Sequence, residues 1–353
     1  MSDDPTASSP RGDATGVKPL AKALRLLAAL LRVREVITLA IIAGVVIFFH
    51  VRTLPQTAEA PHPSIFLSGG NIKSLLVGMS SEAILVAGMC IVIVGGAFDI
   101  SVGSVLGLSG MISVQAMKAG LPMSLSLLLG LLCGAMCGLL NGWLIARLEM
   151  SPLIATLGMM MAARGVVFLI VSNYGAPQAG DLPAAFPAIG QAEVFGMRSF
   201  YVVVVALAVV LIGDILLRNL RWLRQVYYVG GNAQAAALSG INVPRVRMVT
   251  FVICGLMAGL AGIMNAARFG TSTYEAGSGI ELPVIAQCVI GGANLAGGQG
   301  TILGAFLGVV LVSCIKSGLT QLRMPPDWQY VFVGAALIVL VTIDTMVAKR
   351  RKG

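Results

Sequence analysis

The chain has 353 residues, of which 57% are hydrophobic and only 11% charged, and its mean hydropathy is +0.91. A soluble domain carries about a quarter charged residues and could not bury so much apolar surface, so the composition predicts an integral membrane protein. The net charge of +9 does not indicate nucleic-acid binding, because the basic residues stand at the ends of apolar runs. The 43 glycines and 17 methionines favour closely packed helices over strands, so the expected fold class is all-α.

Apolar runs long enough for a membrane-spanning helix, about 20 residues, recur along the chain and predict about ten spans of a polytopic protein. In chain order they are 36–52, 74–95, 101–118, 122–146, 152–172, 200–217, 248–267, 283–294, 301–319 and 328–347. The Gly/Ser-rich third span and the short eighth span are expected to be broken helices, which often surround a substrate path. The transmembrane domain is thus 36–347, between a polar, partly disordered tail (1–35) and a basic tail (348–353).

The distribution of basic residues predicts the orientation of these spans. With ten alternating spans and a cytoplasmic N-terminus, sixteen Lys and Arg residues fall inside and seven outside, while Arg164 lies within a span. The inverse topology would place the sixteen outside, against the positive-inside rule. Both termini and the loop 218–247 are therefore expected to be cytoplasmic.

Two glycine-rich stretches resemble each other. Gly95–Gly107 can be laid over Gly291–Gly304 with one extra residue in the second copy, and each stands between two apolar runs. Internal duplication is typical of transporters, whose substrate sites commonly lie between the repeats. The alternative is that two glycine-rich connections are alike in composition only.

Charged residues inside predicted spans are candidates for function, because burying a charge in the membrane is costly. Asp99 stands at a glycine-rich break, where it could cap the next helix or contact a solute. Glu82 and Arg164 could pair with each other across helices or line a pathway. Asn141 and Thr156 could bond neighbouring helices together or contact the solute. The candidate substrate path comprises Glu82, Asp99, Ser101, Gly103, Ser104, Asn141, Thr156, Arg164 and Glu281.

The sequence lacks the motifs of an ATP-hydrolysing enzyme. No G-x-x-x-x-G-K-[ST] phosphate loop occurs, and no nucleophile–base constellation is evident. Only His50 and His62 are available as histidine ligands, and Cys133 and Cys137 lack further ligands nearby, so neither a metal nor another cofactor is expected. If the protein pumps, its energy comes from a partner chain that binds ATP or from an ion gradient.

The loop 218–247 carries five arginines and no acidic residue. At its centre an alanine-rich segment lies between Gly230-Gly231 and Gly240, which predicts a short helix with a nearly featureless face. Such a helix could dock into a groove of a partner protein. The alternative is an interfacial helix without a partner.

Three motifs together resemble one family. The phrase G-G-N-x-x-A-A-x-x-S-G-I-N-V at Gly230–Val243 is similar to the ATPase-coupling motif of permease subunits from sugar-type ABC importers, the ribose, xylose and arabinose class. F-D-I-S-V-G-S-V-L-G-L-S-G at Phe98–Gly110 resembles the second signature of that family. Gly277–Leu282, followed by Gly291-Gly292 and Gly297–Gly300, is the third match.

The resemblance implies a permease of the vitamin-B12-importer type of fold in a bacterial inner membrane, surrounded by lipid. It also implies a second permease copy, a cytoplasmic ABC ATPase that binds the ATP, and a periplasmic sugar-binding protein. By the same resemblance, the residues expected to couple the permease to the ATPase are Gly230, Gly231, Asn232, Ala235, Ala236, Ser239, Gly240 and Ile241. The alternative function is an ion-coupled secondary transporter of a small polar solute, which would use intramembrane carboxylates such as Glu82 and Asp99.

Overall fold

The structure is a computed structural model that describes residues 34–54 and 64–325, together with Trp328, Val331, Gly334, Ala335, Ile338 and Thr342. The elements are α2 (Arg34–Arg52), α3 (Gly69–Val94), α4 (Val102–Lys118), α5 (Met123–Arg147), α6 (Pro152–Tyr174), η1 (Ala179–Asp181), α7 (Ala185–Gln191), β1 (Glu193–Val194), β2 (Met197–Arg198), α8 (Phe200–Asn219), α9 (Arg221–Gly231), α10 (Ala233–Leu238), α11 (Val243–Phe269), α12 (Glu281–Ile290) and α13 (Ile302–Gln321).

The all-α prediction is confirmed, because the only strands in the described part of the chain form a small two-stranded hairpin, β1–β2. Nine of the ten predicted spans coincide with helices, and no end differs by more than five residues. Within the described residues, seven helices are long and apolar enough to cross a membrane, while α12, with ten residues, is too short to cross alone. Helix α4 is continuous over 17 residues, so the break expected in the third span is wrong. Most of the predicted span 328–347, and the tails 1–33 and 348–353, lie outside the described residues.

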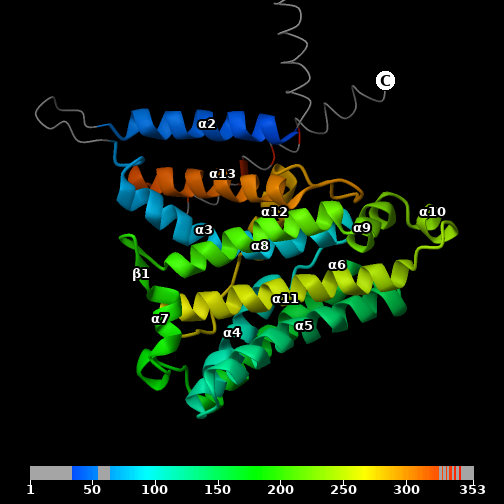
Figure 1. Ribbon diagram of the computed structural model, residues 1–353, viewed down its shortest axis with the longest axis horizontal. Coiled ribbons are helices and arrows are strands. Elements are labelled where there is room, and N and C mark those ends of the chain that lie inside the picture. The colour runs from blue at the N-terminus through cyan, green and yellow to red at the C-terminus, as the bar shows by residue number, and fades with distance from the viewer. Residues whose placement is uncertain are drawn as a thin grey trace, which may run out of the picture.

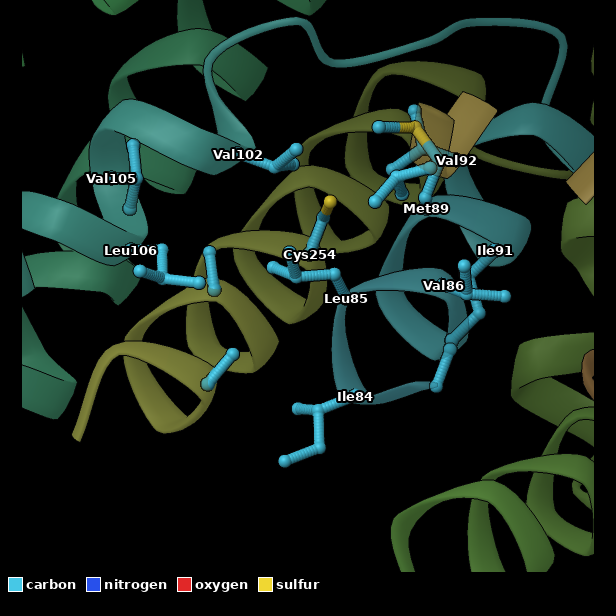
Figure 2. Close-up of a cluster of buried hydrophobic side chains, with 14 of the residues drawn as sticks. Ile84, Leu85, Val86, Met89, Ile91, Val92, Val102, Val105, Leu106 and Cys254 are labelled. Carbon is cyan, nitrogen blue, oxygen red and sulfur yellow. The ribbon is translucent and has the colours of Figure 1, made fainter. Parts of the chain in front are cut away.

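Helix α3 forms the centre of the bundle. Its second half, Ala83–Val94, is buried on every side, which explains why this segment is apolar all round rather than along one stripe. Figure 2 shows these side chains meeting Val102 and Leu106 of α4 and Cys254 of α11. Helix α2, by contrast, packs along α13 at the edge of the bundle (Figure 1) and is largely exposed.

Glycines allow α5 and α11 to pack with their backbones in contact. On α5 a glycine recurs every fourth residue from Gly130 to Gly142. Gly134, Gly138 and Gly142 face α11, while Gly130 faces α4. A Cβ atom added to Gly134 would lie 2.3 Å from the carbonyl oxygen of Gly255, and one added to Gly255 would lie 2.2 Å from that of Gly134. Small residues at such spacing allow membrane helices to approach each other closely, so these glycines serve helix packing.

The two glycine-rich stretches share one backbone geometry. Gly95 and Gly291 end α3 and α12 with similar dihedral angles, and Gly96 and Gly292 follow with φ of +81° and +98°, a region that glycine tolerates best. In both copies the three N–H groups of Gly-Gly-Ala donate to carbonyls four, three and five residues earlier. This matching pattern supports an internal duplication. Both turns lie toward the end of the bundle that carries α9 and α10, opposite to β1 and α7 (Figure 1).

Candidate functional site

Arg164 of α6 organises the first group of candidate residues. Its Nη1 donates to the carbonyl oxygens of Tyr274 and Ala276 at 2.8 Å and 2.9 Å. Its Nη2 lies 3.9 Å from Oε1 of Glu281, at the start of α12. The expected pairing of Arg164 with Glu82 was therefore wrong: Arg164 instead holds the irregular segment 270–280 against α6.

The same segment also packs against α4. A Cβ atom added to Gly103 would lie 2.2 Å from the carbonyl oxygen of Gly277 and 2.5 Å from Oε1 of Glu281. The reciprocal contact, from Gly277 to the carbonyl of Gly103, is also 2.2 Å. The structure thus brings together Gly103, Arg164 and Glu281, three candidate path residues that are far apart in the sequence.

This group lies near the middle of a membrane-spanning helix. Arg164 is 12 residues after the first and 10 residues before the last residue of α6, which at about 1.5 Å per residue places it close to the helix midpoint. Irregular backbone at that depth cannot face lipid, because its N–H and C=O groups would have no partners. The exposed side of the segment 270–280 must therefore face a water-filled path or another protein chain.

Glu82 belongs to a separate polar cleft. Its Oε1 accepts a bond from Lys316 Nζ at 3.0 Å, and its Oε2 accepts one from the side-chain amide of Gln287. The cleft between α3 and α13 has a volume of about 450 Å³. Its polar lining residues are Ser68, Asn71, Ser74, Glu82, Ser313, Lys316, Ser317, Thr320 and Gln321. Lys316 lies inside the predicted span 301–319, so the same rule that selected Glu82 could have found it.

Asp99, Ser101 and Asn141 form a third, buried group. The Asp99 Oδ1 accepts from the backbone N–H of Ser101 at 2.8 Å and from its hydroxyl, and Oδ2 lies 3.4 Å from the Asn141 amide nitrogen. Asn141 also donates to the Ser101 hydroxyl at 3.0 Å. The carboxylate therefore fixes the entry into α4 and bonds it to α5, and its burial keeps it away from any solute in this conformation.

Replacing Asp99 by alanine is expected to destabilise the protein by about 1–3 kcal/mol, because the buried donors of Ser101 and Asn141 lose their acceptor. Asp99→Asn keeps an acceptor oxygen and is expected to cost less. Thermal melting in detergent measures both effects, and uptake per folded molecule shows whether the altered α4 entry also slows transport. A melting temperature for Asp99→Ala equal to that of the native protein would contradict the structural role.

The remaining candidate path residues lie within helix packing. Thr156 donates its hydroxyl to the carbonyl of Pro152 at 2.8 Å, one turn earlier in α6. Ser104 is buried, and among the described residues its hydroxyl has no hydrogen-bond partner. Also within the described residues, no group of three His, Cys, Asp or Glu side chains is placed to hold a metal ion.

The motif at Gly230–Val243 builds α10, a turn and the start of α11, with a cap at the start of each helix. Asn232 accepts a bond from the N–H of Ala235 at 3.0 Å and so begins α10, while Asn242 accepts from the N–H of Arg245 at 3.0 Å and begins α11. Gly240, with φ of +83°, makes the turn between them. The predicted short helix is α10, but the preceding α9 was missed. Its buried Leu223, Val226 and Val229 recur at helical spacing and could have indicated it.

The faces of α10 differ in exposure. Ala236 is only 4% exposed and packs inside the chain. Ala235 and Ser239 are exposed, and Leu238 is 91% exposed. Two grooves of about 600 Å³ and 530 Å³ flank the helix. The second groove is lined by Tyr227, Tyr228, Gly231, Asn232, Ala235, Ala236, Ser239 and Ile241.

Helix α9 contacts both glycine-rich turns at once. A Cβ atom added to Gly230 would lie 1.8 Å from the carbonyl oxygen of Val94 and 2.7 Å from the N atom of Gly298. Gly298 itself donates to that Val94 carbonyl at 2.8 Å, so the two turns are also bonded to each other. The loop between α8 and α11 is thereby joined to the ends of α3, α12 and α13.

Tyr227 joins α9 to the later glycine-rich turn by a hydrogen bond. Its hydroxyl donates to the carbonyl of Gly300 at 2.9 Å. Burial, together with the nearby Cys90 and Asp214, raises the pKa of Tyr227 to about 12. The phenol therefore stays protonated and remains a donor at neutral pH. Sequence reasoning missed this residue, since an aromatic residue in a basic loop gives no signal of a specific partner.

Comparison with known proteins identifies the family. Residues 71–341 match a family described as the permease component of branched-chain amino acid transport systems. The chain is 30% identical to the xylose transport system permease protein of Haemophilus influenzae, over 89% of this chain and 96% of that protein. It is 31% identical to the galactose/methyl galactoside import permease protein of Escherichia coli, over 81% and 90% of the two chains. It is 33% identical to the L-arabinose ABC transporter permease protein of Azospirillum brasilense, over 88% and 89%. Because the match covers most of the chain, the chain belongs to this family of transport-system permease components, in agreement with the motif resemblance.

Proposed function

We propose that the chain is the transmembrane permease subunit of an ATP-driven ABC importer for a monosaccharide or related polyol. The observation that carries the proposal is the junction at Gly230, where the loop carrying the coupling motif touches the turns of both repeats. A shift of α9 and α10 would be transmitted to α3, α12 and α13 together, as alternating access requires. The names of the similar xylose, galactose and arabinose permeases support a sugar as the transported solute.

The translocation path is proposed to run along the exposed face of α6 and the segment 270–282. A second permease copy would face this surface and complete the path. Arg164, Gly103 and Glu281 would hold the wall of the path in place, and a periplasmic sugar-binding protein would deliver the sugar. In this arrangement both termini and α10 face the cytoplasm of a bacterial inner membrane, so the α10 surface is available to an ABC ATPase.

An ion-coupled secondary transporter remains the alternative function. Such a protein needs intramembrane carboxylates that are free to bind a coupling ion. Glu82 is bonded to Lys316, and Glu281 lies beside Arg164. Asp99 has no basic partner among the described residues, but it is buried and its oxygens already accept bonds from Ser101 and Asn141. A carboxylate already neutralised by a basic side chain is less suited to that task, which favours the ATP-driven reading.

The proposal is tested by comparing two exposed hydrophobic residues at opposite ends of the bundle. Leu238→Asp on α10 is expected to weaken binding of the ATPase by about tenfold or more, because a leucine buried at the interface would be replaced by a charge. Phe195 is 90% exposed in the β1–β2 hairpin, close to the 91% of Leu238, so Phe195→Asp is a matched control that should keep the ATPase bound.

Co-purification of the ATPase subunit and sugar-stimulated ATP hydrolysis measure this difference. Neither change fills a packed site in the chain, so both variants are expected to insert in the membrane normally. Equal ATPase recovery and equal hydrolysis with both variants would remove α10 from the coupling interface. ATP-independent, ion-dependent uptake by the native protein would instead support the alternative function.

A further inference from the structure

Two stacked aromatic rings stand on the proposed wall of the path. The rings of Phe168, on α6, and Tyr274, in the segment 270–280, have centroids 5.3 Å apart and planes inclined by 28°. Phe168 is 49% exposed and Tyr274 is 45% exposed, so each ring keeps much of its surface open. An aromatic pair of this kind presents a broad, flat, apolar surface.

The rings are held in place by the contacts already described around Arg164. Phe168 follows Arg164 by one helical turn, and the Arg164 guanidinium donates to the backbone carbonyl of Tyr274 at 2.8 Å. The close contact between Gly103 and Gly277 fixes the same segment from the other side. The position of the Tyr274 ring is therefore set by the backbone of a well-anchored segment.

The surroundings of Tyr274 indicate that its side of the ring pair does not face lipid. Tyr274 belongs to irregular backbone near the midpoint of α6, and such backbone is stable in the membrane only when it is covered by protein or lines a water-filled cavity. Neighbouring residues of the segment, Thr273, Glu275 and Ser278, are exposed as well. A charged and hydroxylated surface beside two open rings suits an aqueous passage better than an apolar contact.

We propose that Phe168 and Tyr274 form a stacking surface that contacts the ring of the sugar during its passage. The inference rests on the proposed function as a sugar permease. A cyclic sugar has faces made of C–H groups, which are attracted to the negative face of an aromatic ring. This attraction is weak, so it can guide a sugar without trapping it in the path.

The first test measures uptake in vesicles that contain the permease with its ATPase and its sugar-binding protein. Phe168→Leu and Tyr274→Leu are each expected to lower the initial rate by about three- to tenfold, the range of one aromatic contact. Tyr274→Phe and Phe168→Tyr keep an aromatic ring at each position, so their initial rates should equal that of the native protein. Tyr201→Leu is the matched control, since Tyr201 is 46% exposed and also contacts an aromatic neighbour, Phe200, but lies at the start of α8.

The second test needs no coupled transport. The purified Tyr274→Trp permease and the native protein, which has three tryptophans of its own, are titrated with xylose, galactose or arabinose. Only the variant is expected to change its emission, at about 0.1 M sugar or more, as one weak aromatic contact implies. If the emission shifts with sugar but the native protein imports none of these sugars, the importer function is overturned and the stacking site is kept. No shift, or native uptake by the leucine variants, overturns the stacking site. If the emission changes with dimer formation and does not depend on sugar, the rings contact the second copy of the chain. That outcome also overturns the stacking site.

Discussion

Replacing Gly230 by alanine is expected to abolish transport and destabilise the protein, whereas the same change at Gly231 should keep stability or raise it by up to about 1 kcal/mol. Both residues end α9, and alanine improves the helix propensity of either position by about 1 kcal/mol. The difference lies in the space around them. A Cβ atom at Gly230 would lie 1.8 Å from the Val94 carbonyl oxygen, while a Cβ atom at Gly231 meets nothing within 4 Å.

The atoms that surround Gly230 are backbone atoms of the two glycine-rich turns, so they cannot move aside like a flexible side chain. Overpacking of this kind costs about 1–3 kcal/mol or more, and here it would push α9 away from the ends of α3 and α13. Melting temperature in detergent and sugar uptake at equal membrane level measure the two consequences. If Gly230→Ala melts and transports like Gly231→Ala, the junction does not transmit the movement of the ATPase.

The membrane spans were predictable because they depend on local properties of the sequence. Length and hydropathy located nine segments, and the short segment 283–294 was recognised as unable to cross alone. The ends of α10 and α11 were signalled by glycine and asparagine, which act within a few residues of their own position. The helix α9 was missed because its exposed arginines interrupt the apolar pattern that marks the spans.

The partners of the charged residues could not be predicted, because they depend on how distant segments pack. Arg164 bonds to backbone carbonyls more than 100 residues later in the chain, and a carbonyl carries no mark in the sequence. Glu82 meets Lys316, 234 residues away, through the contact between α3 and α13. By contrast, the bond from the Ser101 N–H to Asp99 spans two residues, as the first of the two roles considered for Asp99, capping of the next helix, requires. The candidate residues were therefore easier to select than to pair.

Arg164 is the side chain whose loss should have the largest effect on the proposed path. Arg164→Leu would leave the carbonyls of Tyr274 and Ala276 without their donor and Glu281 without its nearby positive charge. The Arg164 side chain is 18% exposed and its Nη2 lies 3.9 Å from Glu281, so the main loss is the donor of the two carbonyls, about 1–3 kcal/mol, and we expect a lower yield of folded protein. Arg198→Leu, at an exposed position in the hairpin, is the control and should change stability by less than about 0.5 kcal/mol.

Arg164→Lys separates the geometry of the side chain from its charge. Lysine keeps a positive charge near Glu281, but its ammonium group is a compact point charge on a flexible stem and lacks the rigid fork that holds two carbonyls together. The segment 270–280 should loosen, so transport should fall more than stability does, and the Phe168–Tyr274 pair should lose its fixed position. Hydrogen exchange of the 270–280 amides and sugar uptake measure these effects side by side. Native exchange and native uptake in Arg164→Lys would mean that the contact between Gly103 and Gly277 alone is sufficient to hold the segment.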